Sequence, residues 1–236
     1  MIEIFYITTQ ILFIFAISYF PIILLEKNNY YNSFKFSLFD KLSINLIFFI
    51  NLLFLISIIN IESYIILFIY LFIIILFFIL KFKNFNFNKI KINYFIISLI
   101  FFIFLISIFF IFKIFFSWDT KTNWFFKTLN FFQNQDIQNL KEFNNFDYPH
   151  LGSFIWSFFW KFPFGSYEYL GRIFYVFLYV LSIFLISNCL KVEIYEKIIF
   201  SILLISLTYN YNLFSGLQDV LIFSIILLFS RFSFVI

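Results

Sequence analysis

Charged residues are scarce in this chain, and so are glycine, alanine, proline, cysteine, methionine and histidine. Its 236 residues include four glycines, three prolines, one cysteine, one methionine, one histidine and one alanine, and only 12% of them are charged. A water-soluble domain contains roughly a quarter of charged residues, so the composition excludes a single soluble domain. The lone Cys189 excludes a disulfide framework and a cysteine-based metal site within the chain.

What the chain does contain is strongly apolar: 64% of the residues are hydrophobic and 46 are phenylalanine. Apolar runs of about twenty residues recur, and a helix of that length crosses the roughly 30 Å core of a bilayer. The sequence therefore predicts an all-α polytopic membrane protein with about seven transmembrane helices. They are expected near residues 4–25, 42–61, 63–80, 92–116, 169–190, 198–214 and 219–235. The first run follows Glu3 and precedes no small-residue cleavage site, which indicates a retained span and not a signal peptide.

The lysines of the short loops predict how these spans are oriented. Loop 81–91 holds four lysines and no acid, and loop 26–41 holds three lysines, so both are expected in the cytoplasm. The N-terminus and loop 117–150 then lie outside, as in an integral protein of a bacterial plasma membrane. The net charge of +4 is explained by basic loops and gives no argument for a nucleic-acid partner.

The segment Leu151 to Phe164 decides the orientation of everything after it. It is apolar, but its roughly 14 residues would reach only about 21 Å as a helix, which is short for a crossing. Trp156 and Trp160 lie within it, and tryptophan favours the headgroup level of a membrane. We expect an interfacial helix on the outer surface, which places Asp219 outside. The chain stops at Ile236, soon after its last predicted span, which suggests a fragment or one product of a larger assembly.

The scarce residue types gather in one region. All four tryptophans, the only histidine and three of the four glycines fall between positions 118 and 172. The amino-acid composition of the rest of the chain indicates mutational bias toward AT-rich codons. The rare residue types therefore carry more information than the abundant ones. We therefore divide the chain into residues 1–91, which are N-terminal helices without a recognisable motif, and residues 92–236, a transmembrane region whose outer loop at 117–168 is where we expect any catalytic residues.

The start of this outer loop has the pattern of an amphipathic helix. One stripe is apolar and the other polar at spacings of three and four residues. The apolar stripe is Trp118, Thr122, Phe125, Leu129 and Phe132, and the polar stripe is Asp119, Asn123, Lys127, Asn130 and Asn134. We expect the apolar stripe to face the outer membrane surface, with Asp119 at the mouth of the fourth span.

Short motifs in this region resemble those of the GT-C glycosyltransferases. The motifs are Trp118-Asp119-(x)4-Trp124-(x)2-Lys127, Asp147-Tyr148-Pro149-His150-Leu151, Gly165-(x)6-Arg172 and Ser215-Gly216-Leu217-Gln218-Asp219. Their order and spacing over residues 117–222 are similar to those of the bacterial relatives of dolichyl-phosphate-mannose protein mannosyltransferases, in glycosyltransferase family 39. His150 departs from the family pattern, since many relatives have proline or leucine there.

This resemblance implies an inverting membrane enzyme that moves a sugar from a polyprenyl-phosphate-linked donor lipid to an acceptor at the outer face. It implies that Asp119 takes the proton of the acceptor. It gives Asp219 as a second catalytic acid, and the two acids together could hold a divalent cation such as Mg²⁺ or Mn²⁺. It also implies substrate binding by a set of four residues: Lys127, Tyr148, His150 and Arg172. Arg172 is the favoured phosphate ligand because a guanidinium binds phosphate bidentately.

An ordinary structural explanation stands beside several of these roles. Asp119 can be a carboxylate at the membrane rim, Asp219 a helix N-cap, and Lys127 a lysine that extends to lipid headgroups. His150 can be a structural hydrogen-bonding residue. Two other functions also remain: a transporter or flippase subunit for lipid-linked sugars, and an inactive, truncated glycosyltransferase. A transporter would place ionisable residues at mid-span, whereas the acids here lie at the predicted rim.

Overall fold

Long apolar runs become helices in a bilayer because a helix satisfies its own backbone groups without water. The computed structural model describes residues 2–25, 36–59, 61–82, 93–112, 115–143, 145–162, 167–210 and 213–233, and this part of the chain is all-α. Its helices are α1 (Ile2–Leu25), α3 (Leu38–Ile59), α4 (Ser63–Phe82), α5 (Tyr94–Phe112), η2 (Thr120–Trp124), α6 (Phe125–Phe132), η3 (Ile137–Glu142), α7 (Leu151–Trp160), α8 (Tyr169–Asn188), α9 (Ile194–Thr208) and α10 (Asp219–Ser233). Residues 26–35 and 83–92, which hold most lysines of the two predicted cytoplasmic loops, lie outside the described residues.

Four of these helices are long and apolar enough to cross a membrane. They are α1, α3, α5 and α8, and they indicate an integral membrane protein. All seven predicted apolar runs are helical, which confirms that part of the prediction. The helices α9 and α10 have 15 residues each, so each rises only about 22 Å.

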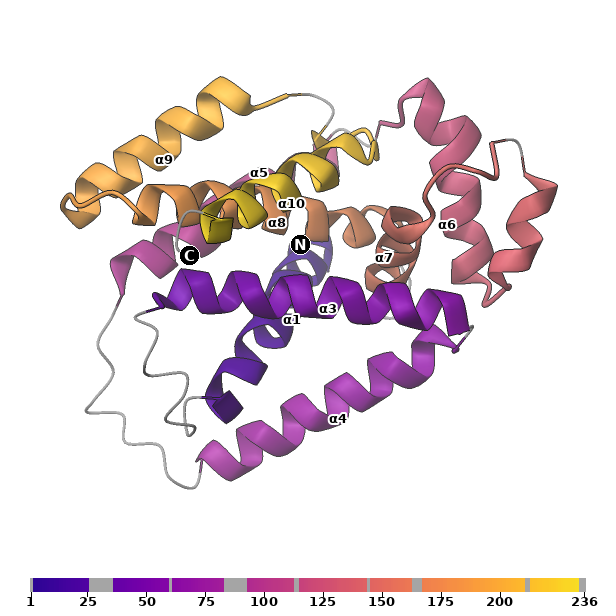
Figure 1. Cartoon of the computed structure of the whole chain (residues 1–236), viewed down its shortest axis with the longest axis horizontal. Helices are drawn as coiled ribbons and strands as arrows, with labels where there is room; N and C mark the ends of the chain where they lie inside the picture. The colour runs from indigo at the N-terminus through magenta and orange to yellow at the C-terminus, as the bar shows by residue number, and fades with distance from the viewer. Residues whose placement is uncertain are drawn as a thin grey trace.

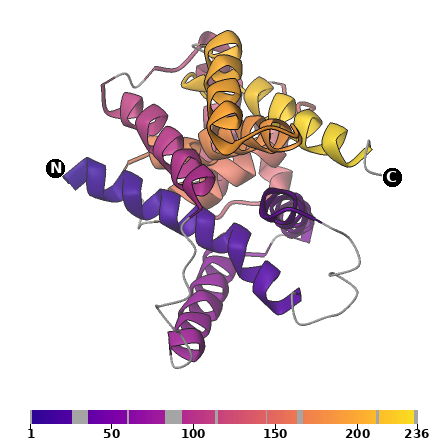
Figure 2. The same ribbon diagram turned by 90° about the vertical axis from the view of Figure 1, so that its left-hand side faces the viewer.

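Helix α8 is the centre of the fold. It is buried almost along its whole length, and it contacts α1, α3, α5, α7, α9 and α10. Figure 1 shows α9 and α10 beside it, and Figure 2 shows α4 reaching away from the other helices. A helix with the composition of a membrane span therefore faces protein on nearly all sides.

The expected exposure of residues 151–164 on the membrane surface is wrong for the part of this segment that the structure describes. Helix α7 is too short to cross a bilayer, as predicted, but Gly152 to Phe159 are all buried in the protein. Trp156 packs on the backbone of α8, where a Cβ at Gly171 would lie 2.3 Å from the Trp156 carbonyl oxygen. Gln10 of α1 donates to the Phe159 carbonyl at 2.8 Å. Trp156 is therefore enclosed by helices and does not anchor the chain at the headgroups; residues 163–166 lie outside the described residues.

The prediction for the helix at 117–134 is wrong for its polar stripe. Asn123 and Lys127 are buried and do not face water, whereas Trp118 of the apolar stripe is 75% exposed, as expected for a lipid-facing residue. The cause is the π-helical segment η2, which begins one residue after Asp119. A π turn holds an extra residue compared with an α turn, so the positions before it and after it no longer share the faces that α-helical spacing assigns. Asp119 therefore stays exposed while Lys127, predicted on the same stripe, turns inward.

The ends of the helices meet at two opposite ends of the protein. At the first, which we name the Arg172 end, Arg172 contacts the segments that follow α5 and precede α10. The start of α1 also lies there, since the Tyr6 and Tyr167 rings are 5.7 Å apart. At the other, the Arg231 end, Arg231 of α10 pairs with Asp40 of α3 at 3.2 Å. Helix α5 therefore ends, and α10 begins, at the Arg172 end.

Candidate functional site

Arg172 joins the two segments that carry the predicted catalytic acids. Its Nη1 donates to the Phe115 carbonyl at 3.2 Å and to the Phe214 carbonyl, and its Nη2 pairs with Glu168 at 2.9 Å. The guanidinium also lies over the ring of Phe116, with its carbon 4.7 Å from the ring centroid. The side chain is completely buried. Protein groups surround the guanidinium, so this geometry does not present Arg172 to a phosphate, the role that the resemblance implied.

Direct contacts between the two segments reinforce this link. The Ser117 N–H donates to the Ser215 carbonyl at 3.4 Å. Gly216 has φ +79°, a conformation that glycine adopts without strain. A Cβ at Gly216 would lie 2.7 Å from Thr120 Cγ2 and 2.8 Å from the Trp156 ring. The turn before α10 thus packs tightly against the start of η2, as the neighbouring yellow and pink ribbons in Figure 1 show.

Asp119 and Asp219 each follow, by a few residues, one of the two segments that make this contact. Asp119 precedes η2 and Asp219 is the first residue of α10, and both side chains are exposed. The structure therefore brings the two acid-bearing segments together at the Arg172 end. Asp219 also has a structural role, because a carboxylate at a helix N-terminus interacts favourably with the helix dipole.

Asp219 borders a pocket of about 190 Å³ between α8, α9 and α10. Tyr179, Thr208 and Asn210 give the pocket polar groups, and Phe223 gives it an aromatic wall. The Tyr179 hydroxyl and the Thr208 hydroxyl lie 2.7 Å apart. A carboxylate, hydroxyls and an aromatic ring in one pocket suit a ligand that has both hydroxyl groups and an apolar face.

Lys127 is held inside the protein and not at its surface. Its Nζ donates to the carbonyls of Asn145 at 2.8 Å and Tyr148 at 2.9 Å. Burial lowers the pKa of the Lys127 ammonium, and Asp147 opposes this shift. The lysine therefore fixes the loop before α7, and its ammonium already has its hydrogen-bond acceptors. This arrangement explains why a lysine occupies a buried position.

Tyr148 and His150 flank that lysine in different ways. Tyr148 is 48% exposed and stacks on Trp124, with ring centroids 5.8 Å apart. His150 is partly buried, and its Nε2 lies 3.0 Å from Ser57 Oγ of α3. Burial lowers the pKa of the His150 imidazole, and the positive charge of Lys127 lowers it further. The histidine is therefore a neutral hydrogen-bonding group between α3 and α7.

Two charged residues were missed in the sequence. Lys161, directly after α7, is fully buried, and its Nζ donates to Asn134 Oδ1 at 2.6 Å and to the Ser63 hydroxyl. Burial lowers its pKa from 10.5 to about 8. Glu168 pairs with Arg172, and the spacing of four residues, which places side chains on one helix face, was a readable signal. No comparable pattern marks Lys161.

A metal site is not evident in the described part of the chain. No group of three or more histidine, cysteine, aspartate or glutamate side chains is gathered there to hold a metal ion. Asp119 and Asp219 would have to share a divalent cation with oxygen atoms of a substrate, which hard cations such as Mg²⁺ accept.

In comparisons with known proteins, no protein-family model, curated protein or solved structure matches the chain.

Proposed function

We propose that this protein is a membrane glycosyltransferase that moves a sugar from a polyprenyl-phosphate-linked donor to an acceptor at the outer membrane face. The observation that carries the proposal is the joining of the Asp119 and Asp219 segments by Arg172 at one end of the helices. Both carboxylates are exposed, and Asp219 borders a pocket whose polar and aromatic lining suits a sugar. The motif resemblance over residues 117–222 gives the reaction class.

The proposed membrane arrangement has seven crossings: α1, α3, α4, α5, α8, α9 and α10. The Arg172 end is then the outer end and the Arg231 end the cytoplasmic one. This is supported by the opposite directions of α5 and α10. The 15-residue helices α9 and α10 cross only where the bilayer thins or where flanking residues extend to the surface.

In the proposed reaction, Asp119 takes the proton of an acceptor hydroxyl as its oxygen attacks the anomeric carbon of the donor. The bond between that carbon and the phosphate oxygen breaks, and the lipid phosphate leaves with the bonding electrons. Asp219 holds hydroxyl groups of the sugar in its pocket. Because Lys127 and Arg172 are enclosed, the exposed Lys121 beside Asp119 is the cation we assign to the leaving phosphate.

The test is sugar transfer by the purified full chain in proteoliposomes, with a labelled polyprenyl-phosphate sugar as donor. Asp119→Asn keeps the shape of the side chain but cannot accept the proton, so we expect transfer to fall by about a hundredfold or more. Glu142→Gln, at an exposed carboxylate on η3, is the matched control and should transfer normally. Full transfer by Asp119→Asn would overturn the proposal.

A further inference from the structure

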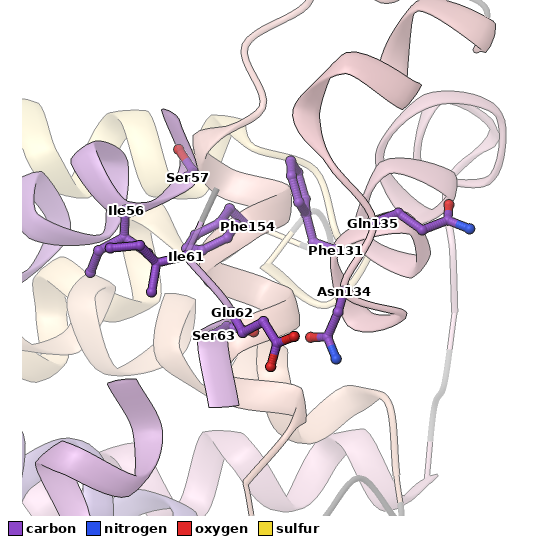
Figure 3. Close-up of a pocket in the computed structure, with 9 residues that line it drawn as sticks. All are labelled: Ile56, Ser57, Ile61, Glu62, Ser63, Phe131, Asn134, Gln135 and Phe154. Carbon is purple, nitrogen blue, oxygen red and sulfur yellow. The ribbon is translucent and has the colours of Figure 1, made fainter. Parts of the chain in front are cut away.

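A second pocket, of about 160 Å³, lies where α3 ends and α4 begins, beside the end of α6. Figure 3 shows the side chains of Glu62 and Asn134 side by side in it, with the amide oxygen of Asn134 turned toward the Glu62 carboxylate. This pocket, which we name the Glu62 pocket, shares no residue with the described lining of the pocket beside Asp219, so the two are distinct.

Buried Lys161 orients two polar groups of the Glu62 pocket. Its ammonium binds the amide oxygen of Asn134, which directs the amide NH₂ away from the lysine. It also binds the hydroxyl oxygen of Ser63, so that the hydroxyl hydrogen is free to point elsewhere. Asn134 has φ 59°, a conformation that asparagine tolerates better than most residues. One enclosed cation thus holds two hydrogen-bond donors in place.

His150 fixes a third polar group in the same way. Ser57 Oγ lies 2.7 Å from the Phe54 carbonyl and 3.0 Å from His150 Nε2. A hydroxyl has one hydrogen, so Ser57 donates it to the carbonyl and accepts from the Nε2–H of His150. This assignment leaves the remaining lone pair of Ser57 as an acceptor at the pocket wall.

The other side of the pocket is apolar. Phe131 and Phe154 line it together with Ile61. The two rings meet edge to face, with centroids 5.1 Å apart, which is a stable aromatic geometry. The pocket therefore offers hydrogen-bonding groups on one side and a rigid apolar surface on the other.

The charges select against ions as ligands. Glu62 repels an anion, and the positive charge of Lys161 is already surrounded by protein acceptors. A divalent cation normally takes several oxygen ligands, whereas Glu62 is the only carboxylate among the residues described around this pocket. The complementary ligand is neutral, carries hydroxyl groups and has an apolar face.

We propose that the Glu62 pocket is a second sugar-binding site, which holds a neutral sugar residue through Glu62, Asn134 and Ser57 against the Phe131 ring. This proposal rests on the proposed glycosyltransferase function, because it assigns the pocket to a sugar bound away from Asp119 and Asp219. The shared chemistry is a neutral sugar ring, which could belong to a soluble glycan or to a lipid-linked one.

The experiment uses the full chain in nanodiscs and neutral methyl glycosides that carry a photoreactive diazirine. A polyprenyl-phosphate sugar with the same group forms the second arm. Mass spectrometry locates the covalent label, and we expect it on the peptides that contain Ile61, Phe131 and Phe154. Labelling by the soluble probe identifies an acceptor site, and labelling by the lipid-linked probe alone identifies a donor site.

Four variants make the result specific. Glu62→Gln loses charge-assisted hydrogen bonds and should weaken labelling roughly tenfold, and Ile61→Trp should block the pocket. Glu142→Gln and Ile65→Trp, at exposed positions outside the pocket, should label like the parent chain. Absence of label at the pocket, or equal labelling of Ile61→Trp and the parent, would overturn the inference.

Asp119→Asn separates this inference from the proposed function. It should keep the label at the Glu62 pocket while it loses sugar transfer. If Asp119→Asn is labelled at the Glu62 pocket and still transfers sugar, the catalytic proposal is wrong and the second sugar site stands. If the parent chain transfers sugar but is not labelled at the Glu62 pocket, the second sugar site is wrong and the catalytic proposal stands.

Discussion

Glu168 and Arg172 form an ion pair at the start of α8, with 2.9 Å between Glu168 Oε2 and Arg172 Nη2. The pair lies at the point where α5 ends and α10 begins, and its arginine holds both neighbouring loops. Burial raises the pKa of the Glu168 carboxyl, and Arg172 opposes that rise. Each partner therefore depends on the other to remain charged at this position.

Replacement of Arg172 by glutamine should destabilise the protein. It leaves the Glu168 carboxylate and two backbone carbonyls without their donor, and breaking a buried pair costs on the order of 3 kcal/mol or more. The melting temperature should fall, and a disulfide engineered between Ser117→Cys and Ser215→Cys should form less readily than with Arg172 intact. Lys141→Gln, at an exposed lysine, is the control. If neither the melting temperature nor the yield of the disulfide changed, Arg172 would not hold the two loops together.

Lys127→Met tests whether Lys127 holds the 145–150 loop or binds substrate. Removing its ammonium leaves buried carbonyls unsatisfied, at roughly 1–3 kcal/mol, so amide hydrogen exchange should quicken in residues 145–150. Lys121→Met, at an exposed position, should leave exchange in that loop unchanged. If Lys127→Met instead raised only the KM for the lipid donor, with normal exchange, the lysine would be a phosphate ligand.

Lys161 should make stability depend on alkaline pH. Its pKa is lowered from 10.5 to about 8 in the folded protein, so between these values the unfolded chain binds more protons than the folded one. The free energy of unfolding then rises with pH across this window. Melting curves from pH 8 upward should show this rise in the parent protein and a weaker one in Lys161→Met. Lys141→Met, at an exposed site, should keep the parental slope.

The proposed orientation can be tested with single cysteines at Asp119, Asp219 and Ile194. The native Cys189 is first replaced by serine. A membrane-impermeant maleimide added outside should label positions 119 and 219, and position 194 should react only after the membrane is opened. Labelling of position 219 from the cytoplasmic side alone would place the two acids on different sides and remove the proposed active site.

Helix positions could be predicted well from this sequence because long apolar runs admit only one secondary structure in lipid. The short turn between the second and third predicted spans is confirmed: α3 ends at Ile59 and α4 begins at Ser63. The ends were less certain, since Phe115 and Phe116 of the run predicted to 116 are not helical, and the run predicted to 214 stops as helix at Thr208. Hydropathy measures preference for an apolar surrounding and does not mark the last helical residue.

The surroundings of each side chain could not be predicted, because lipid and protein interior accept the same residues. Trp156 fits a headgroup belt by composition, yet it is buried against α8 and the turn at Gly216. The burial of Lys127 depends on the π-helical shift after Asp119, which residue spacing does not reveal. Arg172 was singled out because arginine is rare here, but its carbonyl partners come from Phe115 and Phe214, far away in sequence.

The enclosure of α8 has a consequence for how the protein is made. The ribosome adds Phe214 42 residues after Arg172. When α8 first enters the bilayer, the Arg172 guanidinium therefore still lacks the Phe214 carbonyl as an acceptor. Glu168 and Phe115 precede Arg172 in the chain and can shield it during this interval. Insertion of α9 and α10 then completes the shield, and we expect chains truncated before Phe214 to be recognised by membrane proteases as unfinished.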